Sequence, residues 1–296
     1  MPTAMAIRER LKAQITSSKL VVAPGVYDGL TGHLASNAGF ETAYMTGAGT
    51  SIRKGYPDYG LLTMTEMVDN ASDISAIDGL AVIADADTGY GNELNVTRTV
   101  QAYERAGVAA IHIEDQGFPK RCGHLDDKEI IPLDAYTAKI RAAVAARHDP
   151  NFLIIARTDA RAVIGLEDAI RRANAALDAG ADIAFVEAPQ TLDEVRAVPK
   201  SVNGPCLFNL VYGGKTPAFE LSEIEDIGFA LAILPDVLLR SIMMTCEGIL
   251  GPLKASGTLP DQASGIVVRE MFERVGASDW DRLRTQFESS KAEAAE

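Results

Sequence analysis

Short apolar runs recur at regular intervals along the chain. Each run is too short to form a helix, and each is rich enough in Val, Ile, Leu or Phe to form a buried strand. Eight such runs are present, at residues 20–23, 42–45, 80–84, 109–113, 152–156, 183–186, 206–210 and 229–234. The pattern therefore predicts eight strands.

Segments with helical periodicity lie between these runs. The clearest are residues 64–76, 96–106, 133–146, 166–179 and 222–227. Three of them lead into the next strand through a glycine (Gly107, Gly180 and Gly228), which is a common C-terminal stop of a helix. Alternation of strands and helices indicates parallel strands joined by helical crossovers.

Eight strand–helix units in about 240 residues predict an α/β protein with a (β/α)8 TIM barrel, a fold that usually takes about 250 residues. An open doubly wound sheet is the alternative, but no Gly-x-Gly-x-x-Gly turn follows the first predicted strand. We expect a single barrel domain over residues 1–296, with residues 237–296 as a C-terminal helical extension within it. Apolar residues such as Met271, Phe272 and Trp280 predict that this extension packs on another surface, such as that of a second subunit.

Composition narrows the classes of partner. The 296 residues are 47% hydrophobic and 23% charged, which is typical of a globular protein with a substantial core. The formal net charge of −13 argues against nucleic acid or an anionic membrane as a partner, and the sequence contains no Lys/Arg runs. No apolar run approaches the length needed to span a bilayer.

The cysteines indicate a compartment. Cys122, Cys206 and Cys246 are odd in number, lie far apart and lack the paired spacing of metal ligands. Such usage favours a reducing cytoplasm. The first 19 residues are a polar amphipathic stretch with no apolar segment, so we do not expect them to act as a signal peptide. We therefore expect a cytoplasmic protein.

Polar residues concentrate where the predicted strands end. In a barrel of this kind the C-terminal ends of the strands carry the active site. The second strand is followed by Thr46, Gly47 and Ala48, whose small side chains would let backbone N–H groups approach a carboxylate or phosphate. A plain glycine turn is the alternative interpretation of this segment.

Carboxylates follow the third and fourth strands. Asp85 and Asp87 end the third strand, and the fourth strand contains His112 and Glu114. Side chains two residues apart on a strand point to the same face. Two negative charges at such a short distance need a cation or a proton between them. A hard divalent ion such as Mg²⁺ would satisfy both carboxylates. A solvated Asp turn and a hydrogen-bonded core histidine are the alternatives.

The next three strands also end in polar residues. Arg157 ends the fifth strand, Glu187 the sixth and Asn209 the seventh. An arginine at such a position is suited to bind a carboxylate through two N–H groups, although a structural salt bridge is the alternative. Polar residues at the ends of six apolar runs favour a catalytic barrel mouth.

The most distinctive stretch of the chain is Lys120, Arg121, Cys122, Gly123 and His124, which begins six positions after Glu114. The two neighbouring cations are expected to favour the thiolate form of the cysteine, which could then act as a proton carrier or a nucleophile. Most free cysteines are buried packing residues, so the stretch has meaning mainly because acidic residues that could hold a metal precede it.

Together these motifs resemble the isocitrate lyase/phosphoenolpyruvate mutase superfamily, and within it the Lys-Lys/Arg-Cys-Gly-His lyase branch that includes 2-methylisocitrate lyases and 2,3-dimethylmalate lyases. The resemblance covers roughly residues 20–275. The stretches that carry it are residues 24–28, 44–49, 85–91, 112–116, 120–124 and 156–160.

The resemblance implies an assembly and a cofactor. The family fold is a (β/α)8 barrel whose eighth helix is exchanged between subunits, usually in a homotetramer built as a dimer of helix-swapped dimers. The cofactor would be Mg²⁺, with Mn²⁺ as a substitute. Asp85 would bind the ion directly, while Asp87 and Glu114 would act largely through waters.

The resemblance also implies roles around the substrate. Cys122 corresponds to a general acid/base on a mobile loop, with Lys120 and His124 in support. Residues 46–48 correspond to the cradle for the carboxylate of a 2-keto acid, and Arg157 to its cationic partner. The other substrate-binding candidates are Asp58, in the gating-loop segment 55–60, and Arg121, Gly123, Glu187, Asn209 and Thr216.

Two segments depart from the family pattern. Tyr212 stands where methylisocitrate lyases typically have Glu, in a segment that otherwise matches at Asn209 and Thr216. A Thr-Arg-Asn-Glu segment near the C-terminus is recognisable only as Arg269 and Glu270. Both regions help to define the pocket for the second half of the substrate.

The expected reaction is Mg²⁺-dependent retro-Claisen cleavage of a small di- or tricarboxylate, giving pyruvate or glyoxylate and a carboxylic acid. The metal and Arg157 would hold the 2-hydroxy acid half, Cys122 would protonate the departing enediolate, and Tyr44 or a metal-linked group would remove the hydroxyl proton. Hydrolysis of oxaloacetate to oxalate and acetate on the same scaffold is an enzymatic alternative. A non-catalytic binding barrel is the remote alternative.

Overall fold

The chain forms two compact units, Met1–Leu239 and Arg240–Glu296. The structure is a computed structural model that describes residues 2–123, 127–258 and 265–293, with the backbone alone for 288–293. Predicted site residue His124 lies outside the described residues.

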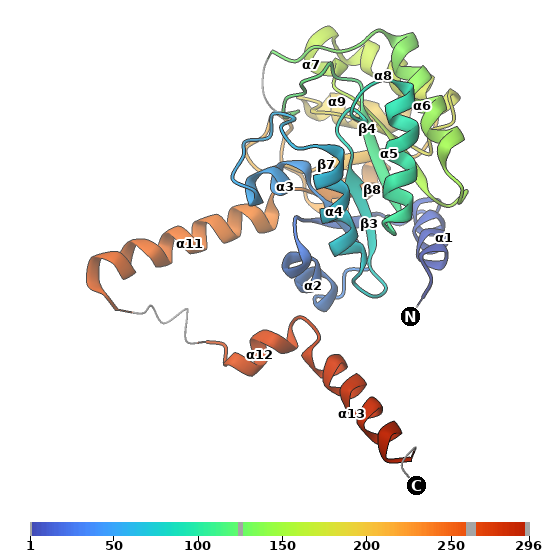
Figure 1. Ribbon diagram of the computed structural model, residues 1–296. Helices are drawn as coiled ribbons and strands as arrows, with labels where there is room; N and C mark the ends of the chain where they lie inside the picture. Colours follow the sequence, from blue (N-terminus) through green and yellow to red (C-terminus); the bar gives the residue numbers. More distant parts are fainter. Residues whose placement is uncertain (1, 124–126, 259–264, 294–296) are drawn as a thin grey trace. The chain divides into compact units, whose positions relative to one another are not determined.

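The first unit confirms the predicted barrel (Figure 1). Eight parallel strands follow the order β6-β5-β4-β3-β2-β1-β8-β7, and an isolated parallel bridge between Ala184 and Cys206 joins the two ends of this series. The strands are β1 (Val21–Val26), β2 (Thr42–Met45), β3 (Ala81–Asp85), β4 (Ala110–Glu114), β5 (Leu153–Thr158), β6 (Ile183–Val186), β7 (Leu207–Asn209) and β8 (Leu231–Leu234).

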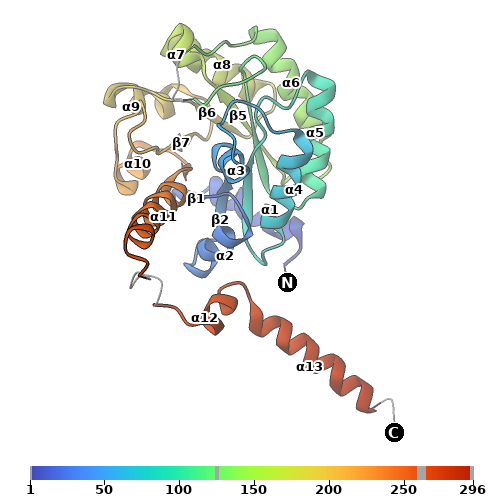
Figure 2. The ribbon, with the colours of Figure 1, turned by 60° about the vertical axis from the view of Figure 1, so that its left-hand side comes forward.

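Helices surround the strands, and the turned view of Figure 2 shows α9 and α10 on the side of β7. The helices of this unit are α1 (Ala4–Ile15), α2 (Gly29–Asn37), α3 (Gly47–Arg53), α4 (Met64–Ser75), α5 (Glu93–Arg105), α6 (Leu133–Ala146), α7 (Ala160–Ile164), α8 (Leu166–Asp178), α9 (Leu192–Ser201) and α10 (Leu221–Ile227). The predicted glycine stops are confirmed, because Gly107, Gly180 and Gly228 adopt φ angles of 87°, 103° and 104°.

Side chains of the strands pack both inside the barrel and between the barrel and the helices. Alternate residues of the strands point inward and form one cluster, which includes Ile83, Ile155, Phe185 and Ile233. The remaining strand residues pack outward against the helices, for example Val82 and Ile111 against α4 and α5. The strands are therefore buried on both faces, which is why they appear in the sequence as continuous apolar runs.

The predicted first strand was too short. It continues from residues 20–23 through Pro24 and Gly25 to Val26. A Cβ at Gly25 would lie 2.3 Å from the carbonyl oxygen of Pro235, so the chain that leaves β8 passes directly against β1. This contact places Pro235 at the C-terminal end of the barrel.

Helix α1 belongs to the barrel. It buries Leu11 and Ile15 in the same cluster as the inward-facing strand residues. The buried guanidinium of Arg8 donates to the carbonyls of Val108 (2.9 Å) and Glu104 (2.6 Å) and pairs with Asp149 at 3.2 Å. These contacts tie the helix to the end of α5 and to the residues that precede β4 and β5.

The second unit holds most of α11 (Val237–Ser256) together with α12 (Val268–Glu273) and α13 (Ala277–Glu293). Many of its large apolar side chains are exposed, among them Met244, Met271, Phe272 and Trp280. In the described part of the chain, no helix combines the length and the apolar character needed to cross a bilayer.

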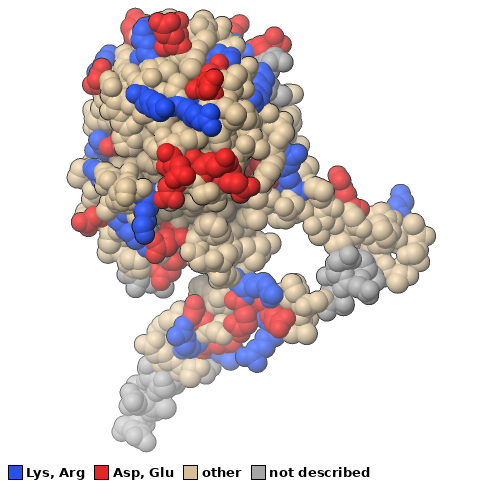
Figure 3. Space-filling model, turned by 180° about the vertical axis from the view of Figure 1, so that it is seen from behind, with Lys and Arg blue, Asp and Glu red and all other residues tan. Residues whose placement is uncertain are grey.

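The surface carries both signs of charge. On the face of the barrel unit seen in Figure 3, Asp and Glu side chains form one broad patch and several smaller groups, with Lys and Arg side chains between them. This distribution accords with the formal net charge of −13.

The role of Arg8 leads to a stability prediction. Arg8→Met removes one partner of a buried ion pair, and we expect a loss of about 3 kcal/mol and a fall in Tm of roughly 6–10 °C by calorimetry. Arg10→Met, on the same helix, is the control. The Arg10 side chain is 33% exposed where it pairs with Glu41, so its removal should cost less than about 1 kcal/mol. Equal effects of the two substitutions would contradict the assignment.

Candidate active site

A cavity of about 240 Å³ opens at the C-terminal ends of the strands. Its walls come from the ends of β2, β3, β5, β6, β7 and β8 and from the loops that follow β2 and β4. The lining residues are Tyr44, Thr46, Ala48, Ile52, Asp58, Asp85, Lys120, Cys122, Gly123, Arg157, Glu187, Asn209, Val211, Pro235, Asp236 and Leu239.

Tyr44, His112 and Asp85 form a buried group on β2, β4 and β3. The Tyr44 hydroxyl lies 2.8 Å from His112 Nε2 and 3.4 Å from Asp85 Oδ2. His112 Nε2 also lies 3.3 Å from Asp85 Oδ1. The rings of Tyr44 and His112 stack with centroids 5.8 Å apart. Burial raises the pKa of Tyr44 well above its usual value, and the Asp85 carboxylate raises it further.

Asp85, Asp87 and Glu114 place three buried carboxylates at this end of the barrel. Burial raises the pKa of Asp87 to about 6, and it also raises the pKa of Glu114 well above the usual value. Burial would act on Asp85 in the same direction, but His112 and Lys120 outweigh it and lower that pKa. The site therefore carries more buried negative charge than its surroundings readily accommodate.

Asp87 differs from the prediction in one respect. Strand β3 ends at Asp85, and Asp87 lies beyond it with a φ of 48°, so strand alternation does not orient its side chain. Instead, the Asp87 N–H donates to Asp85 Oδ1 at 2.9 Å, which ties the turn to the strand end.

Asp85, with Asp87 and Glu114 nearby, supplies carboxylate oxygens of the kind that a hard divalent ion binds. Neither oxygen of Glu114 accepts a hydrogen bond from the described residues, although both are buried. Among those same residues, no group of three Asp, Glu, His or Cys side chains is placed to hold a metal ion without further ligands. Mg²⁺ commonly binds one or two carboxylates and fills its remaining positions with waters and substrate oxygens, so the donor set suits it.

Lys120 links the two loops that flank the cavity. Its buried ammonium lies 2.6 Å from Asp58, in the loop before α4, and 2.8 Å from Asp87. Burial would lower the pKa of Lys120, but the Asp87 and Asp58 carboxylates outweigh it and raise the pKa well above the usual value. Lys120 therefore stays charged and holds residue 58 against the Cys-bearing loop.

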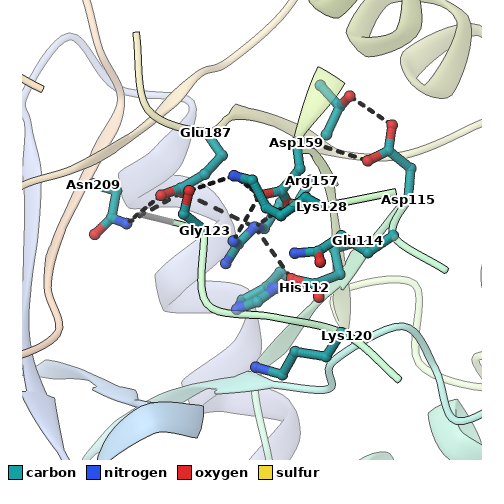
Figure 4. A network of polar contacts seen from close by, with 12 residues as sticks. His112, Glu114, Asp115, Lys120, Gly123, Lys128, Arg157, Asp159, Glu187 and Asn209 are labelled. Atoms are coloured by element: carbon teal, nitrogen blue, oxygen red, sulfur yellow. Dashed lines mark hydrogen bonds and ion pairs between the residues drawn. The ribbon is translucent and has the colours of Figure 1, made fainter. Parts of the chain in front are cut away.

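Arg157 lies among three carboxylates (Figure 4). Its Nε lies 3.0 Å from Asp159, 3.3 Å from Glu114 and 4.0 Å from Glu187. Burial would lower its pKa, but these neighbours raise it. Glu187 in turn accepts from Asn209 Nδ2 at 3.2 Å, which joins the ends of β5, β6 and β7 in one network.

The Cys-bearing loop packs directly on this network. A Cβ at Gly123 would lie 2.3 Å from Arg157 Nη2 and 2.7 Å from Glu187 Cγ, so only glycine fits at this approach. Cys122, which precedes Gly123, is partly buried and lines the cavity.

Most of the predicted site residues meet at this cavity, and a few do not. Asp87 and Glu114 lie behind the lining, and Gly47 packs so close to Asp85 that a Cβ would come within 2.3 Å of Oδ2. The Arg121 side chain is about half exposed and lies 3.7 Å from Asp127, and Thr216 is buried in the loop after β7 without lining the cavity.

The sequence analysis did not predict the residues that form the apolar part of the cavity wall. Ile52, Val211, Pro235 and Leu239 line the cavity together with Asp236. They come from α3, the β7 loop and the segment after β8, where no repeated pattern marks them. The position of Val211, two residues after Asn209 in a matching motif, was the only signal available.

A family model described as phosphoenolpyruvate phosphomutase matches residues 11–251, most of the barrel and all of the strands. The chain belongs to this family. The predicted membership of the isocitrate lyase/phosphoenolpyruvate mutase superfamily is thus confirmed, and the protein is an enzyme of that superfamily.

The chain is similar in sequence to enzymes that are named as lyases. The chain is 47% identical over 236 residues to the 2,3-dimethylmalate lyase of Eubacterium barkeri, covering 79% of this chain and 80% of the relative. It is 41% identical to the 2-methylisocitrate lyase of Aeropyrum pernix, over 96% and 91% of the two chains.

Solved structures agree with this family. An oxaloacetate acetylhydrolase in complex with 3,3-difluorooxalacetate superposes with a TM-score of 0.91 at 37% identity, covering 95% of this chain and 97% of that chain. A phosphonopyruvate hydrolase in complex with oxalate and Mg²⁺ superposes with a TM-score of 0.86 at 30% identity, over 95% and 99% of the two chains.

Proposed function

We propose that this family member is a Mg²⁺-dependent carbon–carbon lyase that cleaves an alkyl-substituted 2-hydroxy-dicarboxylate into a 2-keto acid and a carboxylic acid. The observation that carries the proposal is the convergence of Cys122, Arg157 and the Asp85 carboxylate on one cavity that also has an apolar stretch of wall. Lyases among the named relatives support the reaction class.

Arg157 would bind the carboxylate of the 2-hydroxy acid half, together with the backbone N–H groups of Gly47 and Ala48. Asp159 holds the guanidinium through Nε and Nη2, at 3.0 and 3.2 Å, so its orientation toward the cavity is fixed before a substrate enters. A cation that is already oriented lowers the cost of ordering the substrate.

Asp85 would hold Mg²⁺ directly, with Asp87 and Glu114 acting through waters. When bound, the ion would supply Lewis-acid polarisation of the oxygen that becomes the keto group. Lys120 stays charged between Asp58 and Asp87 and limits the repulsion among the carboxylates.

Two groups would move protons. Tyr44 would take the proton of the 2-hydroxyl while its own proton passes to His112 Nε2, 2.8 Å away. This relay avoids a lasting phenolate, which suits a tyrosine whose pKa is raised mainly by burial. The bond between C2 and C3 then breaks, and the Cys122 thiol would protonate C3 of the departing enediolate.

The apolar wall favours one class of substrate. Ile52, Val211, Pro235 and Leu239 would lie against alkyl substituents, as in a dimethylmalate, whereas oxaloacetate carries no alkyl branch. Hydrolysis of oxaloacetate to oxalate and acetate remains the second candidate, because the oxaloacetate acetylhydrolase structure superposes over 95% of the chain.

A turnover screen tests the proposal. We expect keto-acid release from 2,3-dimethylmalate, and less from 2-methylisocitrate, isocitrate and citramalate. Removal of divalent ions by a chelator should abolish turnover, and added Mg²⁺ or Mn²⁺ should restore it. Oxalate formed from oxaloacetate alone would assign the protein to the second candidate instead, and turnover that persists without metal would contradict the metal role.

The proton donor is tested by Cys122→Ser, which removes the thiol and keeps the shape of the side chain. We expect kcat to fall by about 10²–10⁴-fold, the range of general acid catalysis, while Mg²⁺ binding by calorimetry is retained. Cys246→Ser, at an exposed position in α11, is the matched control and should keep full turnover. A nearly full kcat in Cys122→Ser would remove the cysteine from the mechanism.

We also propose that the protein assembles as a homotetramer of helix-swapped dimers, supported by the exposed apolar side chains of α12 and α13. Native mass spectrometry should then give about four times the chain mass of 31.6 kDa. Replacing Phe272 and Trp280 with Ser should shift the distribution toward smaller species, whereas Arg282→Ser on the polar side of α13 should not. A monomeric wild-type protein would contradict the assembly.

A further inference from the structure

We infer that Lys128 and Gln116 are positioning residues that hold the backbone on both sides of Cys122 and so fix the thiol at the cavity. The inference rests on the proposed function, in which Cys122 carries a proton. Neither residue lines the cavity, so any effect on chemistry must be indirect, through the residues that they hold in place.

Lys128 holds the C-terminal side of the cysteine. Its ammonium donates to the carbonyl of Gly123 and to Asp159 Oδ1, the latter at 2.8 Å (Figure 4). The Lys128 and Asp159 side chains are 1% and 0% exposed where they pair. A buried ammonium needs all of its partners, so moving Gly123 away would leave a charged donor unsatisfied.

Gln116 holds the N-terminal side. Its side-chain amide donates to the Arg121 carbonyl at 2.8 Å and accepts from the Arg121 N–H at 3.0 Å, as a neighbouring strand would. Gln116 lies two residues beyond the end of β4 and is itself buried. Its backbone forms an antiparallel bridge with Ile130. Both neighbours of Cys122 are therefore attached to fixed parts of the barrel.

The same contacts connect the loop to the substrate clamp. Asp159 accepts from Lys128 and also from Arg157, so one carboxylate orients both cations. Burial would raise the pKa of Asp159, but Arg157 and Lys128 outweigh it and lower the pKa, so the carboxylate stays charged. Gly123 in turn packs on Arg157 Nη2. The separation between the bound carboxylate and the thiol is thus set by a single connected unit.

The test combines turnover with thiol reactivity in Lys128→Met and Gln116→Leu. We expect kcat to fall by about 10- to 100-fold, because small misplacement of a catalytic group is costly, while KM changes far less. We also expect alkylation of Cys122 by iodoacetamide, resolved by peptide mass spectrometry, to become about tenfold faster as the loop opens more often. Cys206 is an internal reference, because burial raises its pKa to about 12 and it reacts only when the barrel unfolds.

Arg8→Met is the matched control, since it also removes a buried cation from an ion pair but lies among the loops that precede β4 and β5. It should lower Tm without accelerating the alkylation of Cys122, while Cys206 reports any increase in global unfolding. Gln116→Leu keeps the test decisive if Lys128→Met fails to fold.

Unchanged kcat and unchanged Cys122 alkylation in a folded variant would overturn the inference, as would parallel increases at Cys122 and Cys206. If the wild-type enzyme turns over none of the substrates, the proposed function fails. The alkylation rates would then decide the positioning role by themselves.

Discussion

The site depends on the sharing of a few buried cations among a larger number of buried carboxylates. Lys120 forms ion pairs with Asp58 and Asp87. Arg157 forms ion pairs with Glu114, Asp159 and Glu187. Buried charges are tolerated only when they are paired, so each of these groups constrains the position of the others. These charged residues come from several strand ends and two loops. The ion pairs among them therefore also hold the loops against the C-terminal end of the barrel. The surplus of negative charge also explains why a divalent cation suits the site.

How much of the fold could be predicted follows from how the strands are buried. Parallel strands covered on both faces need continuous apolar runs, and the predicted limits of β2 and β6 are confirmed to the residue. Helix α7 was missed because five residues are too few to show periodicity, and α3 because its first residues, Gly47, Ala48 and Gly49, resemble a glycine turn. The extension of β1 through Pro24 and Gly25 was missed because both residues are unfavourable in strands, and only the contact with Pro235 explains them.

The same limit applies to the site. A polar residue that follows an apolar run is visible in a sequence, so Asp85, Glu114 and Arg157 could be predicted. Contacts between distant positions are not visible. The pairing of Lys128 with Asp159 spans 31 residues, and the approach of Gly123 to Arg157 depends on the path of the loop rather than on any local preference. The apolar wall was missed for a related reason, since Val211 and Leu239 look like ordinary core residues until the fold brings them to the cavity.

The cavity has two halves, which different elements of the fold supply. The polar half consists of strand ends, whose positions the barrel fixes and whose carboxylates and cations depend on one another, so it tolerates little change. The other half consists mainly of apolar side chains from α3, the β7 loop and the segment after β8. Substitutions there alter the shape offered to a substrate at small cost to the fold. Tyr212 follows Val211 directly in the β7 loop, so the departure from the methylisocitrate lyase pattern lies in the same loop as part of this apolar wall.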